Sequence, residues 1–140
     1  MHRRLSILLL LTLACASAPM ERPPGMPAPD MDARLVNPLF FGSGTTAPAT
    51  IELRVTNRGN VPIVVRRIEI DSPGMGQYTL GRYVREHNES VGAGETKPIT
   101  VFATAYAQTT RRPSEPLTIR AIVHFRAEGV HWREVLIMRQ

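Results

Sequence analysis

Histidine is the side chain in this sequence best suited to bind a metal ion, and the chain has four: His2, His87, His124 and His131. The last two fall on segments that the pattern described below pairs as neighbouring strands, so His124 and His131 share one face of a hairpin. A zinc or copper site there would need a further ligand, such as a nearby glutamate. Arg133 and Arg126 would lie directly opposite the two histidines, and guanidinium groups oppose a divalent cation. A metal-binding domain that uses His124 and His131 is therefore an alternative and not the leading hypothesis.

The chain contains no sequence motif for a catalytic nucleophile or for phosphate binding. No serine lies in a Gly-x-Ser-x-Gly turn. The glycine-rich segments 42–44 and 74–76 lack the Gly-Lys-Ser/Thr of a phosphate-binding loop. The chain has 12 acidic residues, but no spacing selects a pair for glycoside hydrolysis. We therefore expect a protein that is not an enzyme and takes no cofactor.

The only cysteine is Cys15, which follows a short apolar run. Residues 1–4 are basic (MHRR) and residues 5–14 read LSILLLLTLA. A membrane-spanning helix needs roughly 20 apolar residues, whereas a basic start followed by a shorter apolar run is typical of a signal peptide. A lone cysteine also excludes an intramolecular disulfide. The sequence thus predicts an exported protein with a signal peptide over residues 1–14.

The segment Thr12-Leu13-Ala14-Cys15 resembles the lipobox of bacterial lipoproteins. The resemblance implies that Cys15 becomes the new N-terminus and carries acyl chains, which together hold a protein stably on a membrane. Because Ala16 follows in place of aspartate, it also implies an outer membrane, facing the periplasm, where the organism has one. The alternative is an ordinary signal peptide cleaved after Ala16, which would give a secreted or periplasmic protein.

Residues 15–33 contain five prolines and show no apolar period. Proline stiffens a chain and removes hydrogen-bond donors. We therefore expect a lipidated cysteine followed by a proline-rich linker that lifts the next domain off the membrane.

The charge of the chain is mild once the signal peptide is removed. The formal net charge of the whole chain is +5. Loss of Arg3 and Arg4 leaves +3, too little to argue for nucleic acid as a partner. The hydrophobic content of 43% is that of a globular protein.

Residues 34–140 show strand patterns and no helical stripe. Ile51, Leu53 and Val55 alternate with polar residues, which is the period of a half-buried strand. At Arg66-Arg67 the apolar parity slips by one residue, which predicts a β-bulge. We expect strands at 35–41, 50–56, 61–71, 77–85 and 99–106, then a loop at 111–116 and two C-terminal strands. About seven strands in one domain predict an all-β, immunoglobulin-like (fibronectin III-like) antiparallel sandwich.

The two C-terminal strands give the most specific structural prediction. With Glu128-Gly129 as a two-residue turn, one register sorts both strands at once, because a slip of one residue would invert every side chain. The pairs on the apolar face are Ala127–Val130, Phe125–Trp132, Val123–Glu134, Ala121–Leu136 and Ile119–Met138. The pairs on the other face are Arg126–His131, His124–Arg133, Ile122–Val135 and Arg120–Ile137. The single tryptophan is therefore expected in the core.

The outer face of this hairpin is the one surface whose composition suggests a binding function. Its cationic residues are Arg120, His124, Arg126, His131 and Arg133, to which Arg66 and Arg67 can add. Such a surface suits an anionic partner, such as lipopolysaccharide phosphates, a cell-wall polymer or an acidic protein patch. The alternative is that the charges only maintain solubility and protect a sheet edge.

The segment 51–70, which reads IELRVTNRGNVPIVVRRIEI, resembles the water-stress and type-2 late-embryogenesis-abundant (LEA) domains and is similar to other bacterial immunoglobulin-like modules. A Gly94-Glu95-Thr96 turn before the apolar segment 99–101 fits the same pattern. The resemblance covers about residues 35–106. It implies a non-catalytic domain and assigns no site residues.

The leading hypothesis is an exported lipoprotein, anchored at Cys15, whose single domain has a structural or binding role in the bacterial cell envelope. The second is an accessory subunit or periplasmic chaperone that binds a client by strand addition.

Overall fold

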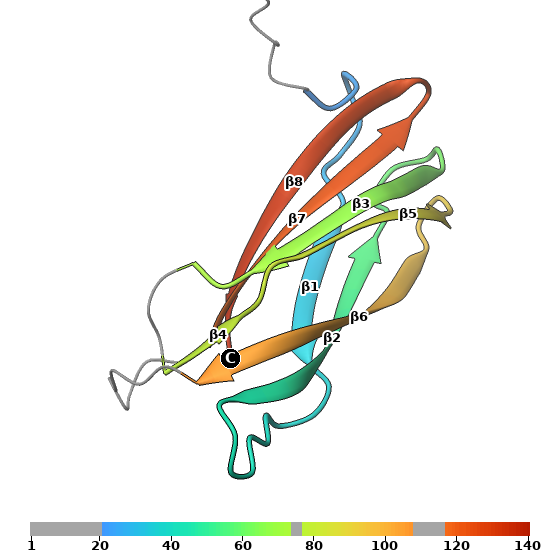
Figure 1. Cartoon of the computed structure of the whole chain (residues 1–140). Coiled ribbons are helices and arrows are strands. Elements are labelled where there is room, and N and C mark those ends of the chain that lie inside the picture. The colour runs from blue at the N-terminus through green and yellow to red at the C-terminus, as the bar shows by residue number, and fades with distance from the viewer. Residues whose placement is uncertain (1–20, 74–76, 108–116) are drawn as a thin grey trace, which may run out of the picture.

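The computed structural model describes residues 21–73, 77–107 and 117–140, and in these residues every regular element is a strand. Eight strands form two four-stranded antiparallel sheets, whose orders are β1-β2-β6-β4 and β5-β3-β7-β8. Sheet A consists of β1 (Asp30–Leu35), β2 (Thr46–Thr56), β6 (Thr96–Ala107) and β4 (Tyr78–Leu80). Sheet B consists of β5 (Tyr83–Val91), β3 (Ile63–Asp71), β7 (Thr118–Ala127) and β8 (Val130–Arg139). Figure 1 shows the two layers. Within the described ranges, no helix is long and apolar enough to cross a membrane.

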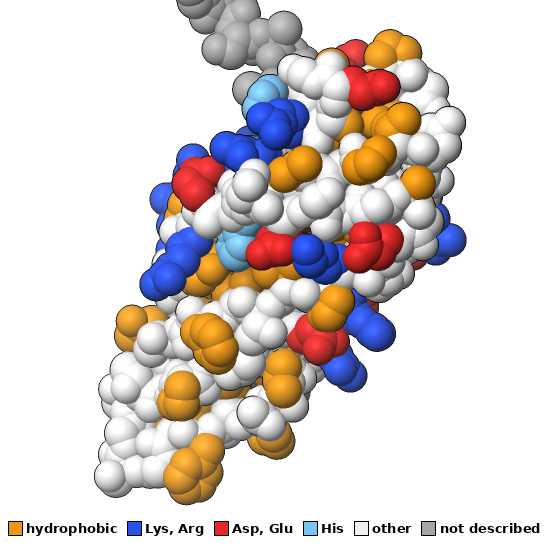
Figure 2. All heavy atoms as spheres, turned by 90° about the vertical axis from the view of Figure 1, so that its right-hand side faces the viewer, with side chains coloured by type: hydrophobic (Ala, Val, Ile, Leu, Met, Phe, Trp, Pro, Cys, Tyr) orange, Lys and Arg blue, Asp and Glu red, His pale blue; other side chains and the backbone are white. Residues whose placement is uncertain are grey.

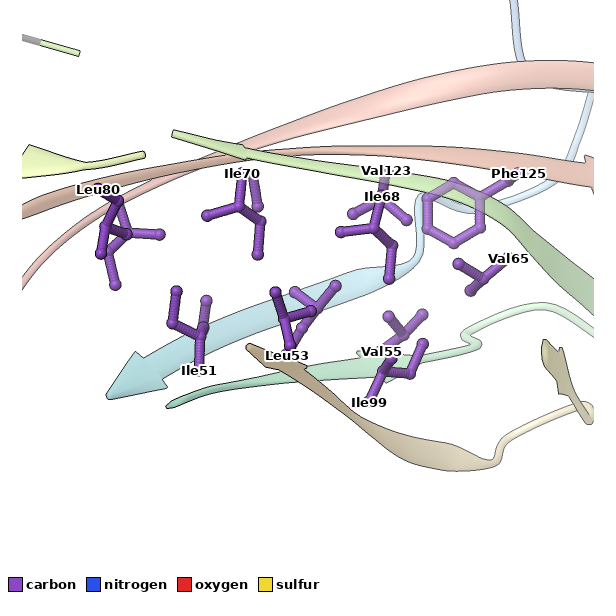
Figure 3. Close-up of a cluster of buried hydrophobic side chains, with 14 of the residues drawn as sticks. Ile51, Leu53, Val55, Val65, Ile68, Ile70, Leu80, Ile99, Val123 and Phe125 are labelled. Atoms are coloured by element: carbon purple, nitrogen blue, oxygen red, sulfur yellow. The ribbon is translucent and has the colours of Figure 1, made fainter. Parts of the chain in front are cut away.

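The core lies between the two sheets and is built from alternate residues of each strand. Ile51, Leu53 and Val55 of β2 are fully buried, and they face Ile68 and other apolar residues of sheet B (Figure 3). The residues between them point to the outer face of sheet A. Burial of a large aliphatic side chain contributes about 1.5–3 kcal/mol, so this layer is the main source of stability.

The predicted hairpin register is confirmed residue by residue. Phe125 lies opposite Trp132 and Arg126 opposite His131, and the pairing continues to Thr118 and Arg139. Glu128 and Gly129 both have positive φ, 50° and 80°, which is the conformation of a two-residue type I′ turn. Trp132 is 2% exposed, so its predicted place in the core is also confirmed.

The predicted β-bulge is confirmed as well. The register of β3 shifts between Val65 and Arg67, against both β5 and β7. Against β7 the extra residue lies in β3 and is Arg66, which changes the parity of that strand, whereas against β5 the extra residue lies in β5, between Glu86 and Glu89. As a result, Ile63 and Val65 before the bulge and Ile68 after it all face the core.

The first strand starts earlier than predicted. The prediction of a strand over 35–41 was wrong, because β1 is Asp30–Leu35 and pairs with β2 from Asp30↔Thr56 to Leu35↔Ile51. Residues 30–33, assigned above to the linker, are thus part of sheet A. Met31 and Ala33 face the core while Asp30 and Asp32 face solvent. This short alternation was hidden by the prolines that precede it.

The strand predicted over 77–85 is two strands in different sheets, so the described residues form eight strands where about seven were predicted. β4 ends at Leu80 and pairs with β6, whereas β5 starts at Tyr83, continues past the predicted end to Val91 and pairs with β3. Gly81 N–H donates to Thr104 O over 2.7 Å at the crossing between the sheets. The predicted loop 111–116, the signal peptide and Cys15 lie outside the described residues.

The described part of the predicted linker packs on the sandwich. Pro23 and Pro29 are buried, and Met26 is half-buried against the core. Arg22 Nε lies 3.4 Å from Glu134 Oε1 of β8. From Arg22 onward, the described residues therefore belong to the domain.

Candidate functional surface

The outer face of sheet B brings together all five cationic residues predicted from the sequence. β3, β7 and β8 are adjacent, so their outward residues form rows across the sheet. Starting from the β7–β8 turn, the rows are Val64–Arg126–His131, Arg67–His124–Arg133, Glu69–Ile122–Val135 and Asp71–Arg120–Ile137. The same rows contain two carboxylates from β3, which divide the surface into two parts.

Arg120 is neutralised by the carboxylate beside it. Its Nε donates to Asp71 Oδ1 over 2.8 Å, and its Nη2 donates to Asp71 Oδ2. This two-point hydrogen bond, together with the charge of Asp71, raises the pKa of Arg120 above its ordinary value. Arg120 is therefore held to β3 and is not available as a free cation.

Glu69 is shared by three basic side chains. His124 Nε2 lies 3.0 Å from Glu69 Oε1, and Arg82 Nη2 donates to Oε2 over 3.1 Å. Arg67 Nε lies 3.3 Å from Oε1, in an ion pair without hydrogen-bond geometry. The hydrogen bond from Arg82 is the largest cause that lowers the pKa of Glu69; partial burial opposes it, and His124 and Arg67 add to it. Glu69 thus ties β3 to β7 and to the segment before β5.

Four cations remain near the β7–β8 turn without a carboxylate partner in the described residues: Arg66, Arg126, His131 and Arg133. We refer to these four residues as the basic cluster. Arg66 donates to the neutral Asn88 Oδ1 over 2.7 Å, and the other three side chains are exposed. The predicted cationic surface is thus reduced to its half nearest the turn.

Apolar side chains occupy the other half of the face, at the edge strand. Val135 and Ile137 of β8 are 55% and 60% exposed, and Ile122 of β7 is half-buried next to Val135. Glu69, Asp71, Arg82, Arg120 and Ile122 line a shallow hollow beside them. Its two carboxylates are already paired with its two arginines, so it offers no free charge to a ligand.

A second exposed apolar area lies on sheet A. Phe102 is 73% exposed, and Val36 and Tyr106 are 47% and 44% exposed. In Figure 2, charged side chains occupy the upper part of the view, and the lowest part carries hydrophobic side chains without charges. No sequence motif marks this area, although Phe102 stands at an outward position of a strongly alternating segment.

The metal-binding alternative gains no third ligand. The described residues contain no group of three or more His, Cys, Asp or Glu side chains placed to hold a metal ion. His124 is engaged by Glu69, whereas His131 lies opposite Arg126, one row nearer the turn. The two histidines are thus diagonal, as the register predicted, and have different surroundings.

The sequence-based prediction did not include Glu69 and Asp71, the acidic partners of His124 and Arg120, although the alternation of β3 places them on the outer face. Glu69 and Asp71 stand at alternate positions of the IEID segment that ends β3, between buried Ile68 and Ile70. Their parity alone places them on the outer face. What the sequence does not show is that β3 pairs with β7, about 50 residues further along the chain.

The chain matches no family model and no curated protein. The solved structure of Northeast Structural Genomics Consortium target SoR45 has a TM-score of 0.54 at 6% identity, covering 81% of this chain and 86% of that one. A protein from Archaeoglobus fulgidus has a TM-score of 0.49 at 11% identity, covering 81% and 94%. A FixG-related protein from Vibrio parahaemolyticus has 0.38 at 16% identity, covering 80% and 95%. The likeness to the first of these concerns the fold alone.

Proposed function

We propose that the domain is an immunoglobulin-like sandwich of the fibronectin III type. Without the three-residue β4, the sheet orders are β1-β2-β6 and β5-β3-β7-β8. In the immunoglobulin lettering, the first three are strands A, B and E, and β3-β7-β8 are C, F and G. The segment 51–70, on which the resemblance to type-2 LEA domains rests, forms β2, the following turn and most of β3. That resemblance therefore concerns framework residues.

We further propose that the protein is a non-catalytic lipoprotein of the cell envelope, anchored at Cys15, which binds an anionic partner through the basic cluster. The observation that supports this proposal is the position of the cluster. It lies at the β7–β8 end of sheet B, close to the place where Arg22 contacts β8. Exposed cations that are not neutralised by carboxylates create a positive potential, which attracts anions.

The anchor is tested by metabolic labelling with a fatty acid in cells that produce the wild type or the Cys15→Ser variant. We expect label in the wild type and none in the variant. Equal labelling of the two proteins, or label in neither, contradicts the anchor. A mature N-terminus at Ser17 or later would instead indicate ordinary signal-peptide cleavage.

Strand addition is a second candidate function, favoured by the free edge of β8. The type I′ turn makes Ala127–Val130 a hydrogen-bonded pair, so the backbone N–H and C=O groups of alternate residues, Val135 and Ile137 among them, point away from β7. No described residue forms a hydrogen bond with those groups. By contrast, the β1 edge is covered, because the Gln140 side chain bonds to Ala33 O and Leu35 N.

The Val135→Pro variant tests this second candidate. It removes an outward N–H but no bond of the β7–β8 ladder, so the domain should stay folded. Val135→Thr keeps the N–H and is the matched control. If a client cross-linked in envelopes pairs with β8, Val135→Pro loses it and Val135→Thr retains it. Equal recovery by both variants excludes this edge.

A further inference from the structure

The described chain begins at the end of the sandwich that carries the β7–β8 turn. Figure 1 shows the first described residues beside the upper end of β8. Arg22 pairs with Glu134, and Glu21 and Arg22 line one shallow hollow with Trp132 and Arg133. Because Pro23 is buried, the chain is held to the domain from this point onward.

The anchor is consequently close to the domain. If Cys15 carries the lipid, only residues 16–20 separate it from Glu21. A fully extended chain spans at most about 3.6 Å per residue, so Glu21 lies within roughly 22 Å of Cys15. A linker that ran free to residue 33 would reach about three times as far. We therefore infer a short linker between Cys15 and the domain, in place of the longer linker over residues 15–33 that the sequence predicted.

The basic cluster lies at this same end. Arg126 and His131 form the row nearest the turn, and Arg133 follows on β8. Acidic residues are also present at this end: Glu128 lies in the turn, Glu21 and Glu134 lie at the β8 edge, and Glu86 of β5 lies opposite Arg67, in the outer row of His124 and Arg133. Of these four, Glu86 alone stands on the outer face, at the β5 edge, so the outer row nearest the turn presents Arg126 and His131 without a carboxylate.

We propose that the β7–β8 end of the domain rests on the lipid headgroups of the membrane that holds Cys15, with the basic cluster facing the phosphates of anionic phospholipids. The inference rests on the proposed function, because it takes the anchor as given. A short link keeps the cluster near the headgroups at high effective concentration, and basic residues strengthen binding to such a surface severalfold.

The test uses the purified lipidated protein in vesicles of phosphatidylcholine, with or without about one quarter phosphatidylglycerol. An environment-sensitive fluorophore is attached to Val130→Cys beside the turn, or to Phe102→Cys on the outer face of sheet A. A quencher on the lipid headgroups reports contact. We expect quenching at position 130 to exceed that at position 102 severalfold, to rise with phosphatidylglycerol, and to fall in about 0.5 M salt because of screening.

Charge variants test whether the cluster makes the contact. Arg126→Gln with Arg133→Gln should remove the increase that phosphatidylglycerol causes. Arg34→Gln with Arg54→Gln removes the same charge from sheet A, where both arginines pair with Glu52, and should leave the increase unchanged. Equal effects of the two double variants, or equal quenching at positions 130 and 102, overturns the proposal.

A separate measurement shows whether the lipid anchor itself is present. Flotation of the wild type with vesicles of phosphatidylcholine alone reports the acyl chains, because the cluster has no anionic lipid to bind there. A protein that floats but shows no quenching at position 130 contradicts the headgroup contact and keeps the anchor. If such a protein binds an acidic protein only when Arg126 and Arg133 are intact, the cluster serves a protein partner and the proposal is wrong.

Discussion

Asn57, one residue beyond β2, donates through Nδ2 to the carbonyl of Val91 at the end of β5, over 3.1 Å. The same amide nitrogen donates to Val61 O over 2.8 Å, and Oδ1 accepts from Gly59 N–H. Asn57 is the one buried polar residue in the described parts of the chain. It therefore joins the β2–β3 turn to the last residue of β5, and links sheet A to sheet B at that end.

Replacement of Asn57 by alanine should destabilise the domain by about 2–4 kcal/mol, because it removes the side-chain donor to the buried carbonyl of Val91 and to the partly buried carbonyl of Val61. The free energy of unfolding in urea measures this effect. Asn60→Ala, at an exposed position of the same turn, is the control and should change stability by no more than about 0.5 kcal/mol. Equal stability of the two variants would show that Asn57 is dispensable.

Trp132 should tolerate phenylalanine far better than alanine. Its ring stacks on Phe125 with centroids 5.5 Å apart, and Nε1 is buried without a hydrogen-bond partner in the described structure. Trp132→Ala should cost about 3–5 kcal/mol, whereas Trp132→Phe keeps a ring and loses no hydrogen bond. Thermal unfolding followed by circular dichroism compares the two. A loss with phenylalanine as large as that with alanine would mean that the indole nitrogen has a role.

Glu69 should make the protein more stable above its pKa than below it. Because hydrogen bonds from Arg82 and His124 hold the folded-state pKa below the ordinary value of 4.5, the ionised group stabilises the fold at higher pH. That contribution is lost as the pH falls through the folded-state pKa. Unfolding free energies at about pH 6 and pH 3 should therefore converge for the wild type and Glu69→Gln at the lower pH.

Glu128→Gln is the matched control for this titration. Glu128 is exposed in the β7–β8 turn and pairs with no cation of the described residues. Its substitution removes the same charge without breaking a network. If Glu128→Gln shows the same pH dependence as Glu69→Gln, the effect comes from net charge and not from the contacts of Glu69.

Phe102 should be replaceable by serine with little change in stability. It is 73% exposed on the outer face of sheet A, so its removal opens no cavity and should alter the unfolding free energy by about 0.5 kcal/mol or less. The smaller apolar area should lower self-association, as measured by light scattering against concentration. Phe125→Ser, at a fully buried position, is expected to prevent folding. A strong loss of stability with Phe102→Ser would mean that a further part of the chain covers this ring.

The register of the C-terminal hairpin could be predicted because each of its strands carries the same information. Phe125 and Trp132 share a face only when Glu128-Gly129 forms the turn, and the other residues of that face are then apolar except for Glu134, which lies opposite Val123. The bulge at Arg66 was predictable for a related reason, since only an added residue keeps both halves of β3 in the core. By contrast, the short alternation of β1 after the prolines was too weak to place a strand.

Local patterning by itself determined the strand class, the parity of each strong strand and the hairpin, because side-chain alternation acts over two residues and turn chemistry over four. Tertiary structure decided which cations remain free. Asp71 and Glu69 approach Arg120 and His124 only because β3 pairs with β7, and pairing between distant segments is selected by the packing of the whole core. The same packing holds residues 21–33 to the sandwich, which the proline-rich composition did not reveal.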